Sequence, residues 1–306
     1  MSGETISVAS HLARVPFLAG HDPSSITRLA GLTNLNHLVA VDGERYVVRI
    51  PGPGTAEYID RRAEAFAARS AAAAGVNADV LFFDESDGLM VTRFVDDALT
   101  MTPELFTDTA RVERAADVLR ALHRDADLFA VDFRLFPMID EYKALLAAKR
   151  ARLPEGYEVV QRDAEAARLA LEANPVVLVP SHCDPLCENF LDTGRRMYLI
   201  DYEYSGNNDP MWDLGDLAVE GEFTAEQEAV LLRSYFGGEP PRDQVGRMVV
   251  YKAMCDLLWT LWGVIQHVND NPVDDFWAYA VNRFERCRTL MTSPEFAEHV
   301  DAIGAR

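Results

Sequence analysis

Several features that mark other classes of protein are missing from this chain of 306 residues. It has four cysteines, too few and too scattered for the disulfide framework of a small secreted protein, so we expect reduced thiols. Cys183 and Cys187 lack the second Cys/His pair that a zinc site needs. The longest apolar run, near residues 257–265, is far below the roughly 20 residues that span a bilayer, and the first residues lack the basic and apolar regions of a secretory signal. We therefore expect a cytoplasmic protein that does not insert into a membrane.

Basic residues are scarce as well. The chain has 29 Lys and Arg against 49 Asp and Glu, which gives a net charge of −20. Partners with a phosphate backbone require a basic surface, so we expect no nucleic acid, and an anionic membrane is disfavoured. An acidic excess suits a cationic ligand, although many proteins are acidic for solubility alone. The charge excludes partners more than it identifies one.

What the composition does contain is enough apolar residues for a sizeable core. With 49% hydrophobic and 25% charged residues, the chain fits one large domain or two lobes. Its first third alternates β-rich runs with turn residues, of which Asp42-Gly43 is a hairpin signal. We expect strands over residues 26–30, 36–41, 46–50, 80–83 and 89–94, and a helix over residues 60–74.

Beyond residue 96 the pattern becomes helical. We expect helices over residues 107–123, 139–152, 162–172, 224–235, 243–268 and 274–289. Two short β runs, residues 176–179 and 197–200, interrupt them, and we expect these runs to form one hairpin around residues 180–189. The sequence thus predicts an α+β fold with a small β-rich N-terminal lobe over residues 1–96 and a large, mostly helical C-terminal lobe over residues 97–306.

The strongest chemical signal is the pattern His182-x-Asp184-x₄-Asn189, followed by an apolar strand that ends at Asp201. Phosphoryl transfer needs a carboxylate that takes or orients the acceptor's hydroxyl proton, an oxygen ligand of Mg²⁺ a few residues later, and a second carboxylate ligand on a neighbouring loop. Asp184, Asn189 and Asp201 fit these roles. The pattern alone is modest, because Asp and Asn in turns more often satisfy backbone donors. The carboxylates that crowd behind the strand strengthen it.

Two segments resemble the catalytic and metal-binding motifs of the choline/ethanolamine kinase family. They are residues 181–190, Ser-His-Cys-Asp-Pro-Leu-Cys-Glu-Asn-Phe, and residues 200–215, Ile-Asp-Tyr-Glu-Tyr-Ser-Gly-Asn-Asn-Asp-Pro-Met-Trp-Asp-Leu-Gly. That family belongs with the aminoglycoside phosphotransferases in the protein-kinase-like fold and uses ATP and Mg²⁺. The resemblance implies the following roles: Asp184 as catalytic base, Asn189 and Asp201 as Mg²⁺ ligands, Glu203 as a supporting carboxylate of the metal site, and His182 and Asp213 as structural braces of the loop.

The small lobe supplies candidates for the nucleotide site. The loop with Gly31, Thr33 and Asn34 resembles the family's phosphate-covering loop, in which Gly permits close backbone approach and hydroxyl or amide groups contact phosphate. The same residues would also make an ordinary turn. The connector between the lobes, with Phe94 and Val95, would supply backbone contacts to adenine.

A phosphate-binding cation is also expected in the small lobe. Arg49 occupies the place where a kinase has the strand cation that holds the α- and β-phosphates, and Glu64 is its expected helix partner. A guanidinium can bind phosphate through two donors, which suits Arg49 to this role. The alternative is an edge-strand Arg that pairs with a helix Glu for solubility.

Aromatic residues in the helical lobe suggest the acceptor site. Two Trp residues three apart lie on one face of a helix. A quaternary ammonium has no N–H to donate, so its site must use aromatic faces, at about 0.5–2 kcal/mol each, and a nearby carboxylate. Aromatic stripes on helices are more often core. The resemblance to choline kinases nevertheless implies an acceptor site formed, with Asp184, by Tyr204, Glu220, Trp259, Trp262 and Tyr279.

Together these residues predict an ATP-dependent kinase that phosphorylates the hydroxyl of choline or ethanolamine, a small cationic amino alcohol, and that works as a monomer or homodimer. Two alternatives stay open. A phosphotransferase of the same fold could act on another alcohol, such as an aminoglycoside, thiamine or a sugar. A catalytically silent module could bind choline-like cations, but it would have no need of Asp184, Asn189 and Asp201 together.

Overall fold

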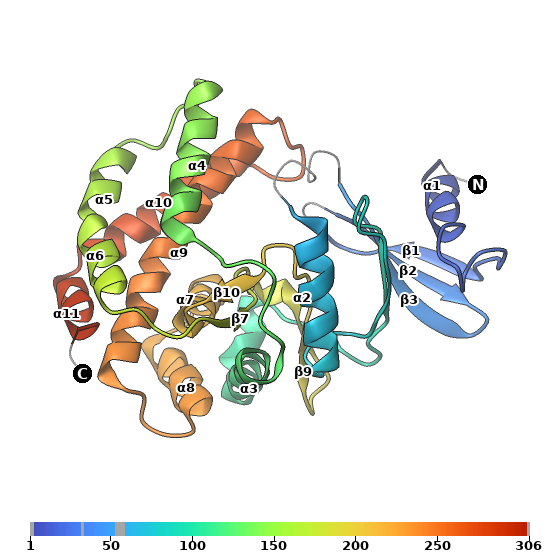
Figure 1. Ribbon diagram of the computed structural model, residues 1–306, viewed down its shortest axis with the longest axis horizontal. Helices are drawn as coiled ribbons and strands as arrows, with labels where there is room; N and C mark the ends of the chain where they lie inside the picture. Colours follow the sequence, from blue (N-terminus) through green and yellow to red (C-terminus); the bar gives the residue numbers. More distant parts are fainter. Residues whose placement is uncertain (1–2, 32–33, 53–58, 305–306) are drawn as a thin grey trace.

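The computed structural model describes residues 3–31, 34–52 and 59–304. Within them the chain forms a small lobe on an antiparallel sheet and a large, mostly helical lobe (Figure 1). The connector between β5 and β6 contains residue 96, where the sequence predicted the boundary. The predicted division into a β-rich lobe and a helical lobe is confirmed.

The small lobe contains a five-stranded sheet in the order β1-β2-β3-β5-β4, in which all neighbours are antiparallel. Asp42 and Gly43 close the β2–β3 hairpin with positive φ angles of 51° and 84°, as a tight two-residue turn requires. The predicted strands are confirmed to within two residues at either end. The elements are α1 (Gly3–Leu12), β1 (Ser25–Arg28), β2 (Leu35–Val41), β3 (Glu44–Ile50), α2 (Arg61–Ala73), β4 (Val80–Phe83) and β5 (Met90–Arg93).

Helix α2 lies between the sheet and the large lobe (Figure 1). Asp60 begins it by accepting hydrogen bonds from the backbone N–H groups of residues 62 and 63. Its alanines contact both sides: Ala65 packs with residues of β4 and β5, whereas Ala67 and Ala71 belong to the core of the large lobe. Small side chains let α2 approach both lobes closely, which places Glu64 at their junction.

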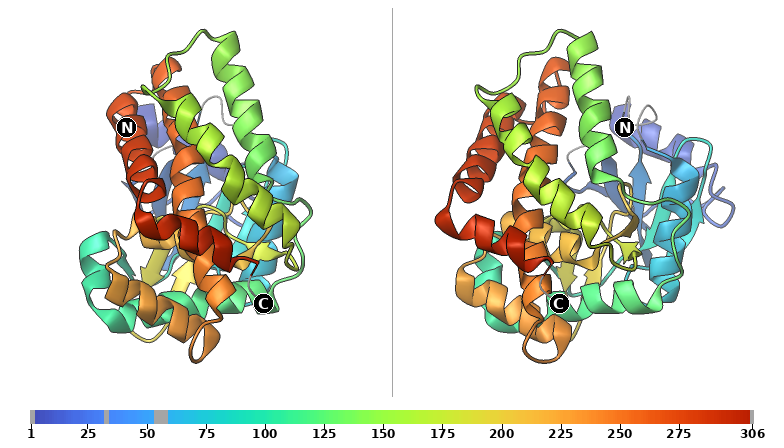
Figure 2. Two further views of the ribbon diagram at one scale, coloured as in Figure 1. Left: turned by 90° about the vertical axis from the view of Figure 1, so that its left-hand side faces the viewer. Right: turned by 60° about the vertical axis from the view of Figure 1, so that its left-hand side comes forward.

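The large lobe is built around α9, against which α4, α7, α10 and α11 pack (Figure 2). Its elements are β6 (Leu99–Thr100), η2 (Pro103–Thr107), α3 (Thr109–Asp125), α4 (Leu135–Ala148), α5 (Tyr157–Asp163), α6 (Glu165–Ala173), β7 (Val179–Ser181), η3 (Cys187–Asn189), β8 (Phe190–Asp192), β9 (Met197–Leu199), β10 (Gly206–Asn208), α7 (Pro210–Glu220), α8 (Ala225–Phe236), α9 (Arg242–Val268), α10 (Phe276–Met291) and α11 (Pro294–Ala302). The predicted helix over residues 162–172 is two short helices, α5 and α6, and α1, α7 and α11 were not predicted.

Helix α9 is, among the described residues, the one helix long and apolar enough to cross a membrane by length and composition. Its most apolar window of 18 residues has a mean hydropathy of 1.4, and 89% of that window is buried inside the protein. Because neighbouring helices of the same chain already cover it, α9 is the central core helix of the large lobe.

The predicted hairpin between residues 176–179 and 197–200 is wrong. β7 begins only at Val179 and pairs with β10, whereas β9 pairs with β8, which directly follows Asn189. The turn of the actual hairpin contains Gly194 with a φ of 77°, a conformation that glycine adopts without strain. The loop at residues 182–189 is therefore held between two separate strand pairs.

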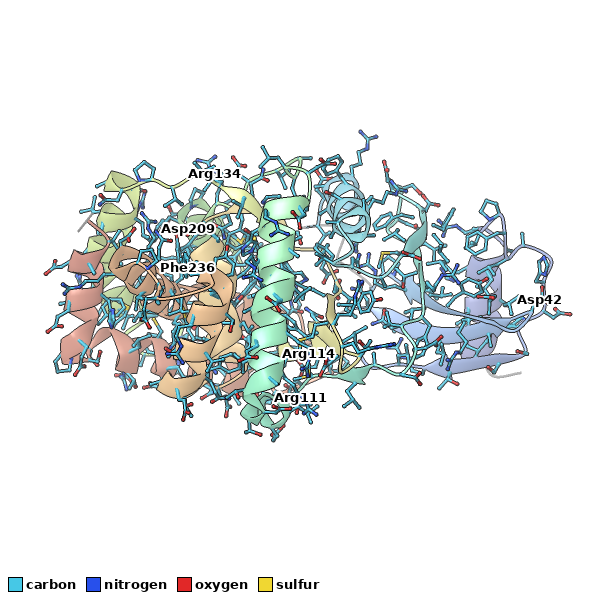
Figure 3. All side chains as sticks on the ribbon, turned by 90° about the horizontal axis from the view of Figure 1, so that it is seen from below. Asp42, Arg111, Arg114, Arg134, Asp209 and Phe236 are labelled. Carbon is cyan, nitrogen blue, oxygen red and sulfur yellow. The ribbon has the colours of Figure 1, made fainter. Side chains whose placement is uncertain are left out.

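An ion pair fixes this hairpin to the helical lobe. Arg111 and Arg114 lie along α3 (Figure 3), and Arg114 donates two hydrogen bonds, of 2.9 and 2.7 Å, to the two carboxylate oxygens of Asp192. Asp192 is buried at the end of β8. Such a two-point guanidinium–carboxylate contact is strong and directional, so it fixes the position of the strand that leads out of the loop.

Candidate active site

Asp213 of α7 binds the backbone at the start of the loop at residues 182–189. The carboxylate of Asp213 accepts hydrogen bonds from the backbone N–H groups of His182 at 2.7 Å and Cys183 at 2.8 Å, and from Nε2 of His123 at 3.0 Å. The indole of Trp212 donates to the Cys183 carbonyl at 3.0 Å. Since both Asp213 oxygens are used, this fully buried carboxylate determines where the loop starts.

His182 joins the loop to the strand that precedes Asp201. Its Nε2 lies 2.9 Å from the carbonyl oxygen of Ile200, and because a carbonyl can only accept, Nε2 carries the hydrogen. Burial lowers the pKa of His182, which keeps the ring neutral. The ring also packs edge-on against Tyr202, with centroids 4.9 Å apart. His182 therefore ties the positions of Asp184 and Asp201 together.

Asp184 is the partly exposed carboxyl that this loop presents. Burial raises its pKa well above the ordinary value, and the nearby charges of Asp216, Glu220, Asp201 and Glu203 raise it further. The first two of these lie on α7 and the other two follow β9. The charges of two groups of acidic side chains, which come from different parts of the lobe, thus act on Asp184.

The first acidic group surrounds Arg49. This buried guanidinium forms an ion pair with Glu64 of α2 and a 3.1 Å contact with Asp201. Arg61 contacts Glu64 at 2.7 Å and Glu203 at 3.7 Å. Burial opposes the charge of Arg49, but Glu64, Asp201 and Glu203 outweigh it, so its pKa is raised. The expected partner of Arg49 is therefore present, in a buried network that joins both lobes rather than in a surface pair.

The three carboxylates of this group could hold a metal ion. Oxygens of Glu64, Asp201 and Glu203 all lie within 4.8 Å of one another. Carboxylate oxygens are the ligands that Mg²⁺ prefers, so the donor set fits this ion. The predicted ligand Asn189 uses its amide N–H to donate to the backbone carbonyl of Asp184 at 3.0 Å.

Glu203 is a carboxylate of this group whose ionised form is disfavoured. Burial and the adjacent Asp201 raise its pKa from 4.5 to about 7, although Arg49 and a hydrogen bond from Asn34 act in the opposite direction. That hydrogen bond is 2.9 Å long and ties the phosphate-covering loop to the metal-site candidates. A cation beside Glu203 would relieve its unfavourable charge.

The loop that carries Asn34 is closely packed at Gly31. A Cβ on this glycine would lie 2.6 Å from the Asn34 carbonyl oxygen and 2.8 Å from Nδ2 of Asn36, so any side chain would displace the loop. Thr33, which the sequence assigns to phosphate contact, lies outside the described residues.

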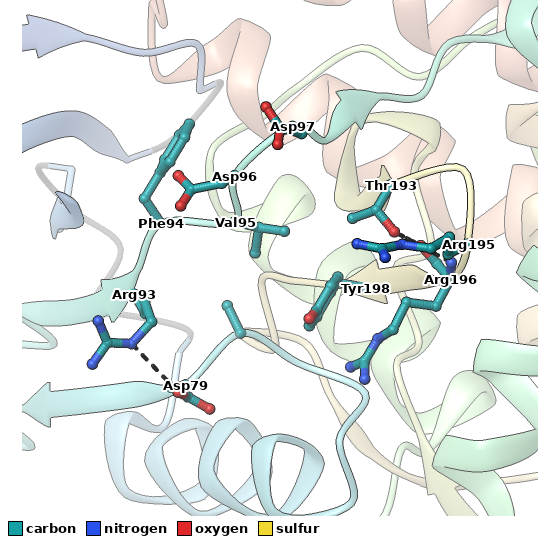
Figure 4. A pocket seen from close by; sticks show the side chains of 11 residues that line it. Asp79, Arg93, Phe94, Val95, Asp96, Asp97, Thr193, Arg195, Arg196 and Tyr198 are labelled. Carbon is teal, nitrogen blue, oxygen red and sulfur yellow. Dashed lines mark hydrogen bonds and ion pairs between the residues drawn. The ribbon is translucent and has the colours of Figure 1, made fainter. Parts of the chain in front are cut away.

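A pocket of about 520 Å³ lies between the connector that joins the two lobes and the β8–β9 hairpin (Figure 4). Phe94 and Val95 line it, but the acidic residues around Arg49 do not. The Phe94 N–H is already donated to the Arg45 carbonyl at 3.1 Å. Adenine contacts from this connector would therefore have to use other backbone groups than the Phe94 N–H. The complete lining is Ala78, Asp79, Arg93, Phe94, Val95, Asp96, Asp97, Thr193, Arg195, Arg196 and Tyr198.

The predicted aromatic residues come together in one cluster. Trp259 and Trp262 of α9 lie edge to face with centroids 6.5 Å apart, and Tyr204 contacts Trp259 at 5.5 Å. Trp262 also contacts Tyr279 of α10 at 5.7 Å, and its indole donates to the Tyr204 hydroxyl at 3.1 Å. Four rings from three separate segments of the chain therefore form one cluster, which includes a residue of the loop that follows Asp201.

The carboxylates beside this cluster differ from the prediction in one respect. Glu220, the expected partner of a cationic acceptor, forms an ion pair with Arg283 of α10. Asp216, which the sequence reasoning missed, is fully buried and accepts a 3.5 Å hydrogen bond from the indole of Trp259. Its spacing of four residues from Glu220 on a helix could have indicated it. The second acidic group is thus Asp216 with Glu220.

The four cysteines are free thiols, all buried, as the sequence predicted. Burial raises the pKa of Cys183 well above its ordinary value, and the charge of Asp213 contributes. These thiols are therefore poor nucleophiles and poor metal ligands.

The chain is similar to known proteins over most of its length. The profile of the phosphotransferase enzyme family matches residues 25–245. A choline/ethanolamine kinase family protein from Mesorhizobium loti has 51% sequence identity and a TM-score of 0.90, over 99% of each chain. The choline kinase LicA from Streptococcus pneumoniae has 28% identity and a TM-score of 0.80, over 95% of this chain and 99% of that one. A LicA structure in complex with AMP has 27% identity and a TM-score of 0.78, over 98% and 100%.

Proposed function

The chain belongs to the choline/ethanolamine kinase family, and we propose that it transfers the γ-phosphoryl group of ATP to the hydroxyl group of choline or ethanolamine. The observation that carries this function is the way Asp184 is presented, on a loop that Asp213 anchors and that His182 joins to the strand before Asp201. Of the two acidic groups whose charges act on Asp184, one contains Asp201 and Glu203 and suits a metal–phosphate complex. The other contains Asp216 and Glu220 and borders the aromatic cluster.

On the nucleotide side, Arg49 is the buried cation that binds and neutralises phosphate oxygens, and Glu64 orients it. Asp201, Asn189 and Glu203 would hold Mg²⁺, which when bound supplies positive charge that offsets the charge of the phosphates. Asn34 closes the phosphate-covering loop over this region through its hydrogen bond to Glu203. Each contact aligns the γ-phosphate without taking part in bond making.

On the acceptor side, Asp184 orients the hydroxyl group for in-line attack. The hydroxyl oxygen forms a bond to the γ-phosphorus, the bond from that phosphorus to the oxygen of ADP breaks, and the hydroxyl proton passes to Asp184. A carboxyl whose pKa is raised is a better proton acceptor than an ordinary Asp, because catalysis works best when its pKa approaches the operating pH. The aromatic cluster holds the ammonium group through ring faces.

ADP release with MgATP across a panel of alcohols tests this proposal. We expect turnover with choline or ethanolamine and little with an aminoglycoside, thiamine or a sugar, because the four-ring cluster suits a small ammonium group, whereas aminoglycosides and thiamine are larger cations and a sugar is uncharged. Asp184→Asn, which keeps the shape of the side chain, should lower turnover by at least about a hundredfold and leave the folded protein intact. An active Asp184→Asn enzyme, or a panel led by an aminoglycoside or sugar, would contradict the proposal. The monomer or homodimer state and the cytoplasmic location stay predictions from the sequence.

A further inference from the structure

Helix α7 presents three acidic side chains to the interior of the large lobe, and each has a different environment. Asp213 is used completely by the catalytic loop and His123. Asp216 and Glu220, one helical turn apart, face α9 and α10. Helices α7 and α10 both pack on α9 (Figure 1), so these two carboxyls lie where the three helices meet.

The charge of Glu220 is already balanced. Arg283 forms an ion pair with Glu220 and a 3.0 Å contact with Asp256, and Arg286 contacts Asp256 at 2.6 Å. Two guanidinium groups therefore offset two carboxylates in one buried network. Glu220 orients this network, but it leaves no net negative charge for a cationic substrate.

Asp216 is less well compensated, because Arg283 and the thiol of Cys255 lower its pKa without forming an ion pair with it. It is 1% exposed, the described residues give it no ion pair, and its Oδ1 has no hydrogen-bond partner among them. Its Oδ2 accepts the hydrogen bond from Nε1 of Trp259, whose ring contacts those of Tyr204 and Trp262. A buried carboxyl without an ion-pair partner destabilises a fold, so its presence beside the ring cluster calls for a ligand that compensates it.

We propose that Asp216 is the positioning residue that makes the acceptor site selective for a cation, acting through the indole of Trp259 on the ammonium group of the substrate. The inference rests on the proposed function and specifies what recognises the acceptor's charge. A carboxylate at the N–H edge of an indole holds the ring in place and adds negative potential, which strengthens the attraction of the ring cluster for a cation. Asp216 itself does not touch the substrate.

This arrangement couples binding of the substrate to a proton. Burial raises the pKa of Asp216 well above its ordinary value, and Glu220 adds to the rise, while Arg283 and the thiol of Cys255 oppose it. A bound cation favours the ionised form, so binding releases a proton at any pH at which the carboxyl of the free protein is protonated. The titratable and charged groups that face Asp216 are Glu220 and Asp213 of α7, Cys255 of α9, Arg283 of α10, and Cys183 and Asp184 of the catalytic loop.

The test compares choline with 3,3-dimethylbutan-1-ol, an uncharged alcohol of the same shape, in the wild type and in Asp216→Asn. We expect Asp216→Asn to raise the KM for choline about tenfold or more. The kcat, the KM for ATP and the inhibition constant of the neutral alcohol should each change less than about twofold. Asp163→Asn, an exposed residue of α5 without a partner among the described residues, is the matched control and should behave as the wild type.

Two outcomes would overturn the inference. One is an Asp216→Asn enzyme that keeps the wild-type preference for choline over the neutral alcohol. The other is a loss of kcat for choline at an unchanged KM, which would show a structural role. If the wild type does not phosphorylate choline or ethanolamine at all, the proposed function fails instead, so the two failures are distinguishable.

A second measurement serves if Asp216→Asn does not fold. Calorimetric titration of Asp184→Asn with choline at pH 7, in two buffers of different ionisation enthalpy, counts the protons released on binding without a contribution from Asp184. We expect release with choline and none with the neutral alcohol. Equal proton counts for the two ligands would contradict the inference.

Discussion

Replacement of Glu203 by Gln should make the ligand-free protein more stable at high pH. Burial and the charge of Asp201 raise the pKa of Glu203 from 4.5 to about 7. At about 1.4 kcal/mol for each pH unit, the ionised side chain costs the fold about 3 kcal/mol. Gln occupies the same volume and keeps an oxygen that can accept the hydrogen bond from Asn34, so the variant loses the charge and little else.

The pH window follows from the direction of this shift. Below pH 4.5 Glu203 is protonated in both the folded and the unfolded chain, so the wild type and the variant should be equally stable. Between pH 4.5 and about 7 the unfolded chain releases the proton first, and the wild type loses stability progressively. Above about pH 7 Glu203 is ionised in the folded protein as well, and the full cost of its buried charge lowers the stability of the wild type. The stability advantage of Glu203→Gln should therefore be larger at pH 8 than at pH 5 by about 2–3 kcal/mol.

Urea unfolding at pH 5 and pH 8, without Mg²⁺ or nucleotide, measures this difference. Glu239→Gln, an exposed position without a partner among the described residues, is the control and should show no dependence on pH. Addition of Mg²⁺ and ADP should favour the wild type, because a bound cation compensates Glu203. If the two proteins differed by the same amount at both pH values, Glu203 would not be the group that titrates, and its role as an uncompensated carboxylate would be wrong.

Two further variants probe the loop and the rings. Asp213→Asn places an amide N–H against one of the backbone N–H groups that now donate to Asp213. Urea unfolding should therefore show a loss of stability of about 2–3 kcal/mol, and kcat should fall while the KM for ATP stays unchanged. An unaltered kcat would contradict the bracing role of Asp213. Trp262→Ala should raise the KM for choline about tenfold or more and leave the KM for ATP unchanged. Trp277 contacts His267 rather than the cluster, so Trp277→Ala should change neither KM. Equal effects of the two variants would show that the cluster is ordinary core.

The sequence predicted those elements whose signals are local. Asp42-Gly43 specified a hairpin turn, the strands of the small lobe alternated, and Asp60 capped a helix without Gly or Pro. The ring cluster followed from spacing within α9 together with family resemblance. Local patterns of this kind survive folding because the turn, cap or face they describe is formed by neighbouring residues.

The strands around the catalytic loop were not predicted correctly, because their pairing is non-local. β10 is the segment Gly-Asn-Asn, which reads as a turn by composition, yet it pairs with β7 some 25 residues earlier. The pairing of Glu220 with Arg283 of α10 likewise depends on the packing of separate helices on α9. No sequence window contains both partners, so the neutralised state of Glu220 and the isolation of Asp216 were visible only in the fold.

The two acidic groups share a physical logic that links stability to function. In each, arginines offset part of the negative charge, Arg49 and Arg61 in one group and Arg283 in the other, and one carboxyl, Glu203 or Asp216, keeps a raised pKa. A fold selected for stability alone would remove such a charge, since ionising a buried carboxyl whose pKa is raised is costly. One of these carboxyls lies toward the metal–phosphate side and the other toward the ammonium side. A cation that binds beside either carboxyl stabilises its ionised form, and this stabilisation adds to the binding free energy of the ligand.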